Sequence, residues 1–219
     1  MITKPSVMAR ILAATAGAPY ELEHPELTRH APFKVVCADP PWPFGDSLPG
    51  PGRGAAKHYG VLSLDDIRNH RFVGGEVLDP RRDLVADDAY LFLWRVSAGA
   101  DIATLTFAEE AYQVARAWGF APKTEVVLRK QTKNGKRHFG MGWHIRNEHE
   151  TCVLAVRGKP KPLVQNIRSV IEARVSRRHS AKPEVFYTDI VEKISDGPYV
   201  ELFARSTRPG WTCLGDEVP

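Results

Sequence analysis

Short apolar runs alternate along the chain with stretches whose apolar residues recur at helical spacing. The runs predict buried strands at residues 34–38, 89–94, 124–130, 151–158, 169–175 and 199–204, with a further short strand at 211–215. Helical patterns begin near residues 5, 63, 106 and 180. This alternation predicts an α/β fold, in which helices cover both faces of a mostly parallel, doubly wound sheet. Such sheets bind ligands beyond the carboxyl ends of their strands.

Two of the helical patterns start with a capping sequence. Asp66 follows Ser63 by three residues, and Glu109 follows Thr106 by three, which is the spacing of a capping box. The helix from Thr106 is expected to bury Ala108, Tyr112, Ala115 and Trp118. The helix that starts near residue 180 is expected to bury Phe186, Ile190 and Ile194 and to stop at Gly197.

Two long segments between these elements predict functional loops. Residues 45–60 are rich in glycine and proline and have almost no apolar content, which is typical of a lid beside a site. Residues 129–146 are basic, with Phe139 and Trp143 among the cations. This mixture suits phosphate contact and base stacking, although a solvated charged loop has the same composition.

The bulk composition is that of an ordinary globular chain. Its 219 residues suit one domain, with residues 1–30 as an N-terminal extension, and its net charge of +4 is only a weak pointer to a polyanionic partner. No apolar run approaches the roughly 20 residues that cross a bilayer. Together with the absence of a signal-peptide pattern, this predicts a cytoplasmic protein that does not enter membranes. The three cysteines lie far apart, which favours buried free thiols.

The strand at 34–38 ends in Asp39, Pro40, Pro41 and Trp42. One interpretation is structural, with the prolines ending the strand and Trp42 capping the core. It leaves Asp39 unexplained, because a carboxylate that closes a buried strand is costly without a donor. An exocyclic aromatic amine is such a donor, since its two N–H groups can bind the Asp39 carboxylate and the Pro40 carbonyl. The nitrogen lone pair then faces an electrophile, and Trp42 offers a plane on which the ring stacks.

The same residues carry a resemblance to a known family. The segment ADPPW resembles motif IV of amino-methyltransferases, and its tryptophan is similar to the MT-A seventy-kilodalton-subunit family of adenine-N6 methyltransferases. Six further segments resemble that family in the expected order: HYGVLSLDDI, DAYLFLW, AWGF, WHIRNEHE, HSAKPEVFY and VELFARSTRPGWTCLGDEV. The resemblance covers residues 34–218. It implies a Rossmann-like methyltransferase fold with a permuted motif order, in which the catalytic motif precedes much of the cofactor site.

Site residues follow from this resemblance. It implies that the catalytic motif is Asp39, Pro40, Pro41 and Trp42. It implies that the cofactor, S-adenosylmethionine, is bound by Asp39, Lys182, Phe203, Arg205, Asp216 and Glu217. Ala204 departs from the family pattern, which usually has a glycine there. The nucleic acid is expected to contact Tyr59, Lys130, Lys133, Lys136, Arg137, Trp143, Asn147 and Glu150. For Asn147 and Glu150, a role in bracing the following strand is equally open.

The implied reaction is direct transfer of a methyl group to the N6 amine of adenine, with no metal ion. The resemblance to compact prokaryotic and phage enzymes favours DNA as the substrate, and RNA is the alternative. A nucleic-acid-binding family member without activity is a second alternative, against which the intact Asp39 and Trp42 argue. Methylation of cytosine N4 or of a glutamine amide fits the remaining segments less well. The chain is expected to be a monomer or a homodimer.

Overall fold

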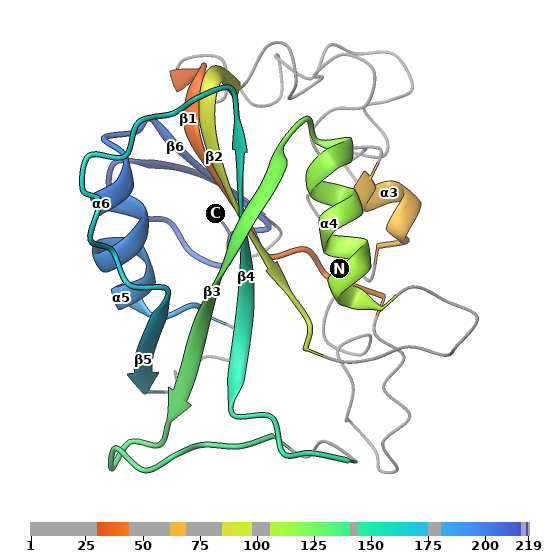
Figure 1. Ribbon diagram of the computed structural model, residues 1–219, viewed down its shortest axis with the longest axis vertical. Coiled ribbons are helices and arrows are strands. Elements are labelled where there is room, and N and C mark those ends of the chain that lie inside the picture. Colours follow the sequence, from red (N-terminus) through yellow and green to blue (C-terminus); the bar gives the residue numbers. More distant parts are fainter. Residues whose placement is uncertain are drawn as a thin grey trace, which may run out of the picture.

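The computed structural model describes residues 30–43, 62–68, 85–97, 106–140, 144–174, 181–215 and 218. Among these residues, the strands are β1 (Phe33–Ala38), β2 (Val85–Arg95), β3 (Ala121–Gln131), β4 (His149–Arg157), β5 (Val170–Arg174), β6 (Tyr199–Leu202) and β7 (Trp211–Leu214). They form a single sheet in the order β5-β3-β4-β2-β1-β6-β7 (Figure 1). The C-terminal strands β6 and β7 therefore lie beside the N-terminal strand β1.

One strand is reversed in this sheet. β4 runs antiparallel to its neighbours β2 and β3, whereas every other pair of the seven described strands is parallel. The prediction of a mostly parallel sheet is confirmed. The last residue of β1, Ala38, is level with Leu93 of β2 and Leu202 of β6. Asp39 consequently leaves the sheet at its carboxyl edge, between two parallel neighbours.

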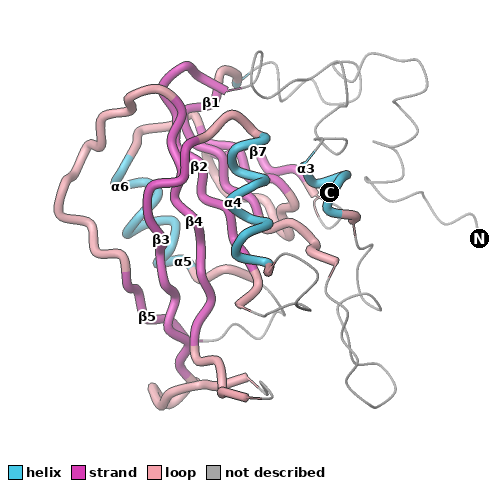
Figure 2. The backbone as a smooth tube through the Cα atoms, turned by 45° about the vertical axis from the view of Figure 1, so that its right-hand side comes forward, coloured by secondary structure: helices cyan, strands magenta, loops and turns pink. Residues whose placement is uncertain are grey.

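Helices cover both faces of the sheet, as predicted (Figure 2). On one face lie α3 (Leu64–Arg68) and α4 (Phe107–Ala117). On the other lie three consecutive helical pieces: α5 (Glu184–Phe186), the π-helical turn η5 (Tyr187–Val191) and α6 (Glu192–Ile194). Because alternate residues of a strand point to opposite faces, β1 contributes Val36 to the core under α4 and Val35 to the core under α5 and η5.

The two predicted helix starts that carry a capping sequence are confirmed. The Thr106 hydroxyl accepts a hydrogen bond from the Glu109 backbone N–H, and the Thr106 N–H donates to the Glu109 carboxylate at 2.7 Å, which completes a capping box before α4. The Ser63 hydroxyl oxygen likewise accepts from the Asp66 N–H at 3.0 Å. Both caps satisfy backbone donors that have no partner within the helix.

The expected buried stripe of α4 is wrong in part. The residues of this segment that are buried are Glu110, Ala111, Val114, Ala115 and Trp118. Tyr112 is only half-buried, because its hydroxyl reaches outward to donate to Glu125 of β3 at 3.0 Å. Glu110 is buried because it forms an ion pair with Arg68 of α3. The prediction for the last helix is confirmed, since Phe186, Ile190 and Ile194 are buried.

The basic loop expected over 129–146 is shorter at its start. β3 continues to Gln131, because its last residues pair with β5 up to Arg174. The Arg129 side chain lies along the sheet and binds Glu172 at 2.7 Å.

The expected helix at 5–16 and the loop at 45–60 lie outside the described residues. No helix in the described part of the chain is both long and apolar enough to span a bilayer.

Candidate active site

A line of four alternating charges crosses the carboxyl edge of the sheet. Its members are Lys130 at the end of β3, Glu150 at the start of β4, Lys182 before α5, and Asp39 after β1. The Lys130 ammonium is 2.6 Å from Glu150, and the Lys182 ammonium is 3.1 Å from Glu150 and 2.9 Å from Asp39. We call these four residues the charge row. Asp39 and Lys182 were predicted to bind the cofactor, and Glu150 and Lys130 to contact the nucleic acid. The structure brings these four residues together.

Sheet topology brings the charge row together. β1 and β3 are parallel and end at the same edge, while β4 is reversed and begins there. Lys130 and Glu150 continue the alternation of Leu128 and Cys152, which face the core under α5 and η5. The segment before α5 lies over this face and delivers Lys182, whose side chain is only 10% exposed.

The side chain of Trp94 forms the floor under Lys182. The Lys182 ammonium lies 4.6 Å from the centroid of the Trp94 ring, which is a cation–π distance. Trp94 is the last fully buried residue of β2 and packs edge-on against Phe186 at a centroid distance of 4.8 Å. The ammonium is thus held by two carboxylates and an aromatic face, so its position is well determined.

Ionisation in the charge row is set by mutual attraction. Burial raises the pKa of Glu150, but the ammonium groups of Lys182 and Lys130 outweigh burial and bring that pKa to about 2. Burial lowers the pKa of Lys182, but the carboxylates of Asp39 and Glu150 outweigh it and raise the pKa above its usual value. Lys182 and Glu150 therefore remain charged across the whole physiological pH range.

Trp42 is placed differently from its expected role as an open stacking plane. Its ring is only 4% exposed, belongs to the core under α4, and meets Phe107 edge-on at a centroid distance of 6.3 Å. Its indole N–H donates to the Trp94 carbonyl at 3.0 Å. This placement agrees with the interpretation in which Trp42 caps the core and not with an open stacking plane, because an indole that finds an acceptor inside the core packs there. Trp42 instead ties the end of β1 to the end of β2.

The two prolines present their carbonyl oxygens to backbone donors. The Trp42 N–H donates to the Pro40 carbonyl at 2.8 Å, and the Leu62 N–H donates to the Pro41 carbonyl at 3.3 Å. A carbonyl oxygen has two lone pairs, so the Pro40 oxygen keeps capacity for a second donor. These bonds fix the backbone immediately after Asp39.

The predicted cofactor residues after β6 lie beside this motif. Phe203 follows Leu202, which is level with Ala38, so Phe203 and Asp39 leave adjacent strands at the same height. Phe203 has a left-handed backbone with φ of 60°, an uncommon conformation for a bulky residue that is concentrated at functional sites. Arg205 follows two residues later and is half-buried. Asp216 and Glu217 lie outside the described residues.

Close backbone packing supports the segment around Phe203. The Ala204 N–H donates to the Leu214 carbonyl at 2.7 Å, and Ala204 is buried. A side chain at Gly215 would overlap the backbone of Ala204. Gly215, directly after β7, therefore allows the backbone of Ala204 to approach it closely.

The predicted nucleic-acid residues separate into two groups. Lys133, Lys136 and Arg137 are exposed on the loop after β3, as expected for phosphate contacts. Lys130 is not part of that group, because its ammonium is held by Glu150 inside the charge row. The Asn147 side chain donates to the Ser97 carbonyl at 2.9 Å, which braces the start of β4. Tyr59 and Trp143 lie outside the described residues.

A second buried polar pair next to the charge row was missed from the sequence. The Tyr187 hydroxyl donates to the Glu201 carboxylate of β6 at 2.6 Å, and the Arg208 guanidinium stacks 3.5 Å from the centroid of the Tyr187 ring. Burial raises the pKa of Tyr187 and also that of Glu201. The sequence did contain a signal for this pair. Glu201 is a carboxylate inside the otherwise apolar strand YVEL, just as Asp39 is a carboxylate at the end of the apolar strand β1.

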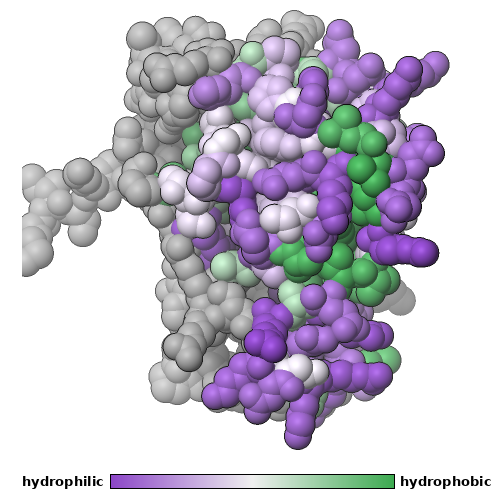
Figure 3. All heavy atoms as spheres, turned by 90° about the vertical axis from the view of Figure 1, so that its left-hand side faces the viewer, coloured by the Kyte–Doolittle hydropathy of each residue, from purple (hydrophilic) through white to green (hydrophobic). Residues whose placement is uncertain are grey.

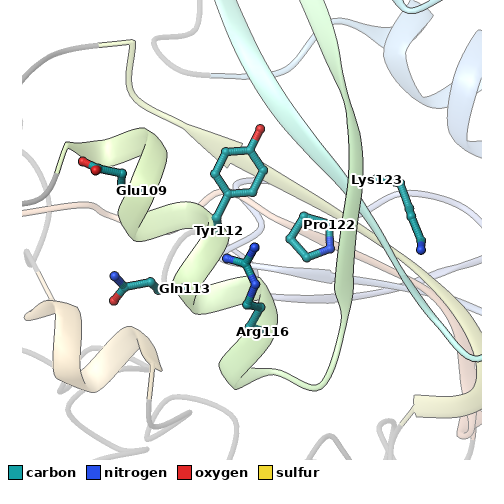
Figure 4. A pocket seen from close by; sticks show the side chains of 6 residues that line it. All are labelled: Glu109, Tyr112, Gln113, Arg116, Pro122 and Lys123. Atoms are coloured by element: carbon teal, nitrogen blue, oxygen red, sulfur yellow. The ribbon is translucent and has the colours of Figure 1, made fainter.

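Other surface features lie away from the charge row. A cavity of about 390 Å³ between α4 and β3 is lined by Glu109, Tyr112, Gln113, Arg116, Pro122 and Lys123 (Figure 4). An apolar patch appears on the face that carries β5 (Figure 3), where Leu163, Val164 and Val170 are exposed. In the described part of the chain, no three His, Cys, Asp or Glu side chains gather closely enough to hold a metal ion.

Comparison with known proteins defines the family. A model of the MT-A70 family matches residues 33–217, and the chain belongs to that family. The human protein named N(6)-adenosine-methyltransferase catalytic subunit METTL3 is 26% identical over 191 residues, which cover 85% of this chain and 28% of METTL3. The Drosophila melanogaster N(6)-adenosine-methyltransferase MT-A70-like protein is 26% identical over 203 residues, covering 90% of this chain and 29% of that protein.

A relative of similar size comes from Mycoplasma sp. The type II methyltransferase M.MunI is 26% identical over 220 residues, which cover 92% of this chain and 84% of M.MunI. The chain thus spans less than a third of the METTL3 and Drosophila proteins but most of M.MunI. The residues matched by the family model, 33–217, include the strands that build the charge row.

Proposed function

We propose that the protein transfers a methyl group from S-adenosylmethionine to the N6 amine of adenine in nucleic acid, with DNA as the favoured substrate. The observation that carries the proposal is the Asp39 carboxylate at the carboxyl edge of the sheet, followed directly by the Pro40 carbonyl, which accepts one hydrogen bond from the Trp42 N–H. These are two acceptors on one short, rigid segment, which is the arrangement that an aromatic amine requires. Family membership supports the same chemistry.

The protein's contribution is to hold the amine. One N–H of the adenine amine binds an Asp39 carboxylate oxygen, and the other binds the Pro40 carbonyl. Two acceptors in this arrangement draw the nitrogen lone pair out of conjugation with the ring and make it nucleophilic. Because the carbonyl of a proline segment is stiff, the direction of the lone pair is set before the reaction, and rate is gained mainly from positioning.

Lys182 and Glu150 keep Asp39 ready for this role. Lys182 binds Asp39 in the free protein, and an incoming amine competes with that ammonium for the carboxylate. Lys182 retains Glu150 when Asp39 turns to the amine, so no buried charge loses its partner. When the new bond to nitrogen has formed, the amine must lose a proton, and the Asp39 carboxylate is positioned to receive it.

The residues at this edge fit S-adenosylmethionine. Asp39 offers a carboxylate to a positive sulfonium, while Phe203 and Arg205 extend the site along β6. When bound, the cofactor supplies the electrophilic methyl group. Asp216 and Glu217 are the residues we assign to its ribose hydroxyls, since carboxylates accept hydrogen bonds from two hydroxyls. The left-handed backbone of Phe203 turns the chain sharply after β6, where a ligand has to pass close to the strand end.

We favour DNA over RNA because one of the relatives is a type II methyltransferase that the alignment includes over most of its own length. The chain aligns over 84% of that type II methyltransferase, against 28% of METTL3, whose name specifies adenosine. RNA remains the alternative substrate, and an inactive nucleic-acid-binding protein is the second alternative. Each alternative predicts a different outcome of a single experiment.

The test is methyl transfer by the full chain. Labelled S-adenosylmethionine is incubated with DNA and RNA of matched sequence, and the nucleosides are identified by mass spectrometry after digestion. We expect N6-methyl-2′-deoxyadenosine from the parent and from Asp189→Ala, a control that removes an exposed carboxylate of η5. Transfer only to RNA would assign RNA, and label in cytosine would overturn the proposal. Cofactor binding without any transfer would identify the inactive binding protein.

A further inference from the structure

Phe139 is an exposed aromatic side chain on a tightly held backbone. The His138 N–H donates to the Lys130 carbonyl at 3.0 Å, and the Gly140 N–H donates to the Asn147 carbonyl at 2.7 Å. Both neighbours of Phe139 are therefore anchored to the ends of β3 and β4. The ring itself is 54% exposed. An anchored backbone with an exposed ring is a rigid platform, and such a ring loses little entropy when something stacks on it.

This platform is attached to the charge row. The Lys130 carbonyl holds the residue before Phe139, while the Lys130 ammonium holds Glu150. The Lys130 N–H donates to the Glu148 carbonyl at 2.9 Å, which closes the stem of the hairpin at the same level. Phe139 thus lies at the rim of the candidate active site. The loop that carries it projects at the lower end of the sheet, beyond the tips of β3 and β4 (Figure 1).

Two aromatic rings of the site are buried and therefore not open for stacking. Trp42 and Trp94 are 4% and 2% exposed, and Trp94 is covered by the Lys182 ammonium. By contrast, Phe139 faces solvent beside three exposed cations of the same loop, Lys133, Lys136 and Arg137. An open ring next to cations is the combination that binds unpaired nucleic-acid strands, in which bases stack on rings while cations follow the phosphates.

We propose that Phe139 stacks on a nucleotide adjacent to the target adenine and holds it unpaired while the target amine reaches Asp39. This proposal rests on the proposed function, and it specifies the substrate as a strand that is single-stranded or locally opened at the flanking position. The charge row receives the target base, and the ring at its rim receives the neighbour. Stacking on a ring tolerates every base, so Phe139 supports binding without selecting a sequence.

The test compares Phe139→Ala, Phe139→Trp and the control Ile145→Ala, which trims the most exposed aliphatic side chain of the same loop (76% exposed). Each full-length protein is titrated by fluorescence anisotropy with a short single-stranded DNA that has one adenine. A second DNA has abasic residues on both sides of that adenine. We expect Phe139→Ala to raise the Kd about tenfold on the intact strand and hardly at all on the abasic strand. Phe139→Trp should restore binding, and Ile145→Ala should resemble the parent.

Equal losses on the intact and abasic strands would overturn the proposal, as would an equal effect of Ile145→Ala. The same DNAs are then used for methyl transfer, where Phe139→Ala should raise KM and leave kcat nearly unchanged. If the parent transfers no methyl group to any DNA or RNA, the proposed function fails, but the anisotropy comparison still decides whether Phe139 stacks on a base. The two failures are therefore distinguishable.

Discussion

The indole N–H of Trp42 donates a 3.0 Å hydrogen bond to the carbonyl oxygen of Trp94 inside the core. This bond joins the residue that closes the Asp-Pro-Pro-Trp motif to the strand whose ring supports Lys182. We therefore expect Trp42→Phe to destabilise the fold by about 1–3 kcal/mol, because a buried carbonyl loses its donor, and Trp42→Ala by about 3–5 kcal/mol. Urea unfolding measures both values.

The matched control for Trp42 is Trp118→Phe. Trp118 also donates its indole N–H to a backbone carbonyl, that of Ile67, and is similarly buried, but it lies at the carboxyl-terminal end of α4. Trp118→Phe should lower stability by a similar amount with unchanged activity per folded molecule, whereas Trp42→Phe should also lower activity because it loosens the segment that holds Asp39. Equal specific activities for the two variants would show that Trp42 has only a structural role.

Replacing Asp39 by alanine or asparagine should remove methyl transfer and leave the fold nearly intact. Lys182 keeps Glu150 in these variants, so its charge stays paired and the free energy of unfolding should fall by only about 1–2 kcal/mol. Calorimetric titration with S-adenosylmethionine should still detect binding. Near-normal turnover of an adenine substrate by either variant would refute the role of Asp39 as an acceptor of the amine.

Acid should weaken the fold through Glu150. The pKa of this carboxyl is lowered to about 2 in the folded protein, below its usual value of 4.5, so its contribution to stability is complete above pH 4.5 and is lost as the pH falls toward 2. The contribution is at most about 3 kcal/mol. Denaturation at pH 6, 4 and 3 should show a smaller loss for Glu150→Gln than for the parent. Glu148→Gln, a neighbouring change, should retain the loss of the parent.

Three exposed cations of the loop after β3 should control the salt dependence of nucleic-acid binding. If Lys133, Lys136 and Arg137 each neutralise a phosphate, their joint change to alanine should flatten the slope of log affinity against log salt by about 2–3 for duplex DNA. Lys159→Ala combined with Lys161→Ala is the control, because these exposed lysines follow the end of β4 at the opposite edge of the sheet, where the Lys159 N–H donates to Asp88. An unchanged slope in the triple variant would mean that the loop is merely solvated.

Gly215→Ala should disturb the segment around Phe203. The added methyl group would overlap the backbone of Ala204, which cannot move away without breaking its hydrogen bond to Leu214. We expect binding of S-adenosylmethionine to weaken at least tenfold in calorimetry. Gly210→Ala is the comparison: Gly210 has a left-handed backbone with φ of 77°, but its Cβ would meet no atom within 4 Å. It should cost about 1 kcal/mol of stability and leave cofactor affinity unchanged.

Much of the fold followed from local pattern. The strands, the capped helix starts and the mostly parallel sheet were predicted from apolar periodicity and from Ser63 and Thr106, because burial and capping act over a few residues. The buried side of α4 was predicted less well, since it depends on which helix lies opposite. Glu110 is buried only because Arg68 of another helix pairs with it. Periodicity contains no information about such a partner.

The site was predicted unevenly for a related reason. Asp39 stood out because a carboxylate at the end of a buried strand requires a donor, and the resemblance added Lys182 and Glu150. Neither route could place Lys130 in the charge row, and the sequence alone could not decide between Trp42 as a cap of the core and Trp42 as a stacking plane. Both placements follow from the register between β3 and β4 and from the position of β2 beside β1. Register is a property of the assembled sheet, so a single sequence read locally does not specify it.

The reversal of β4 places both ends of one loop at the edge of the sheet that carries the charge row. Because β3 ends and β4 begins at the same edge, Lys130 and Glu150 fix both ends of the intervening loop independently of what lies between them. Residues 133–140 can therefore be varied in a library while Lys130, Glu150 and, through Lys182, the Asp39 that we propose to hold the amine keep their positions.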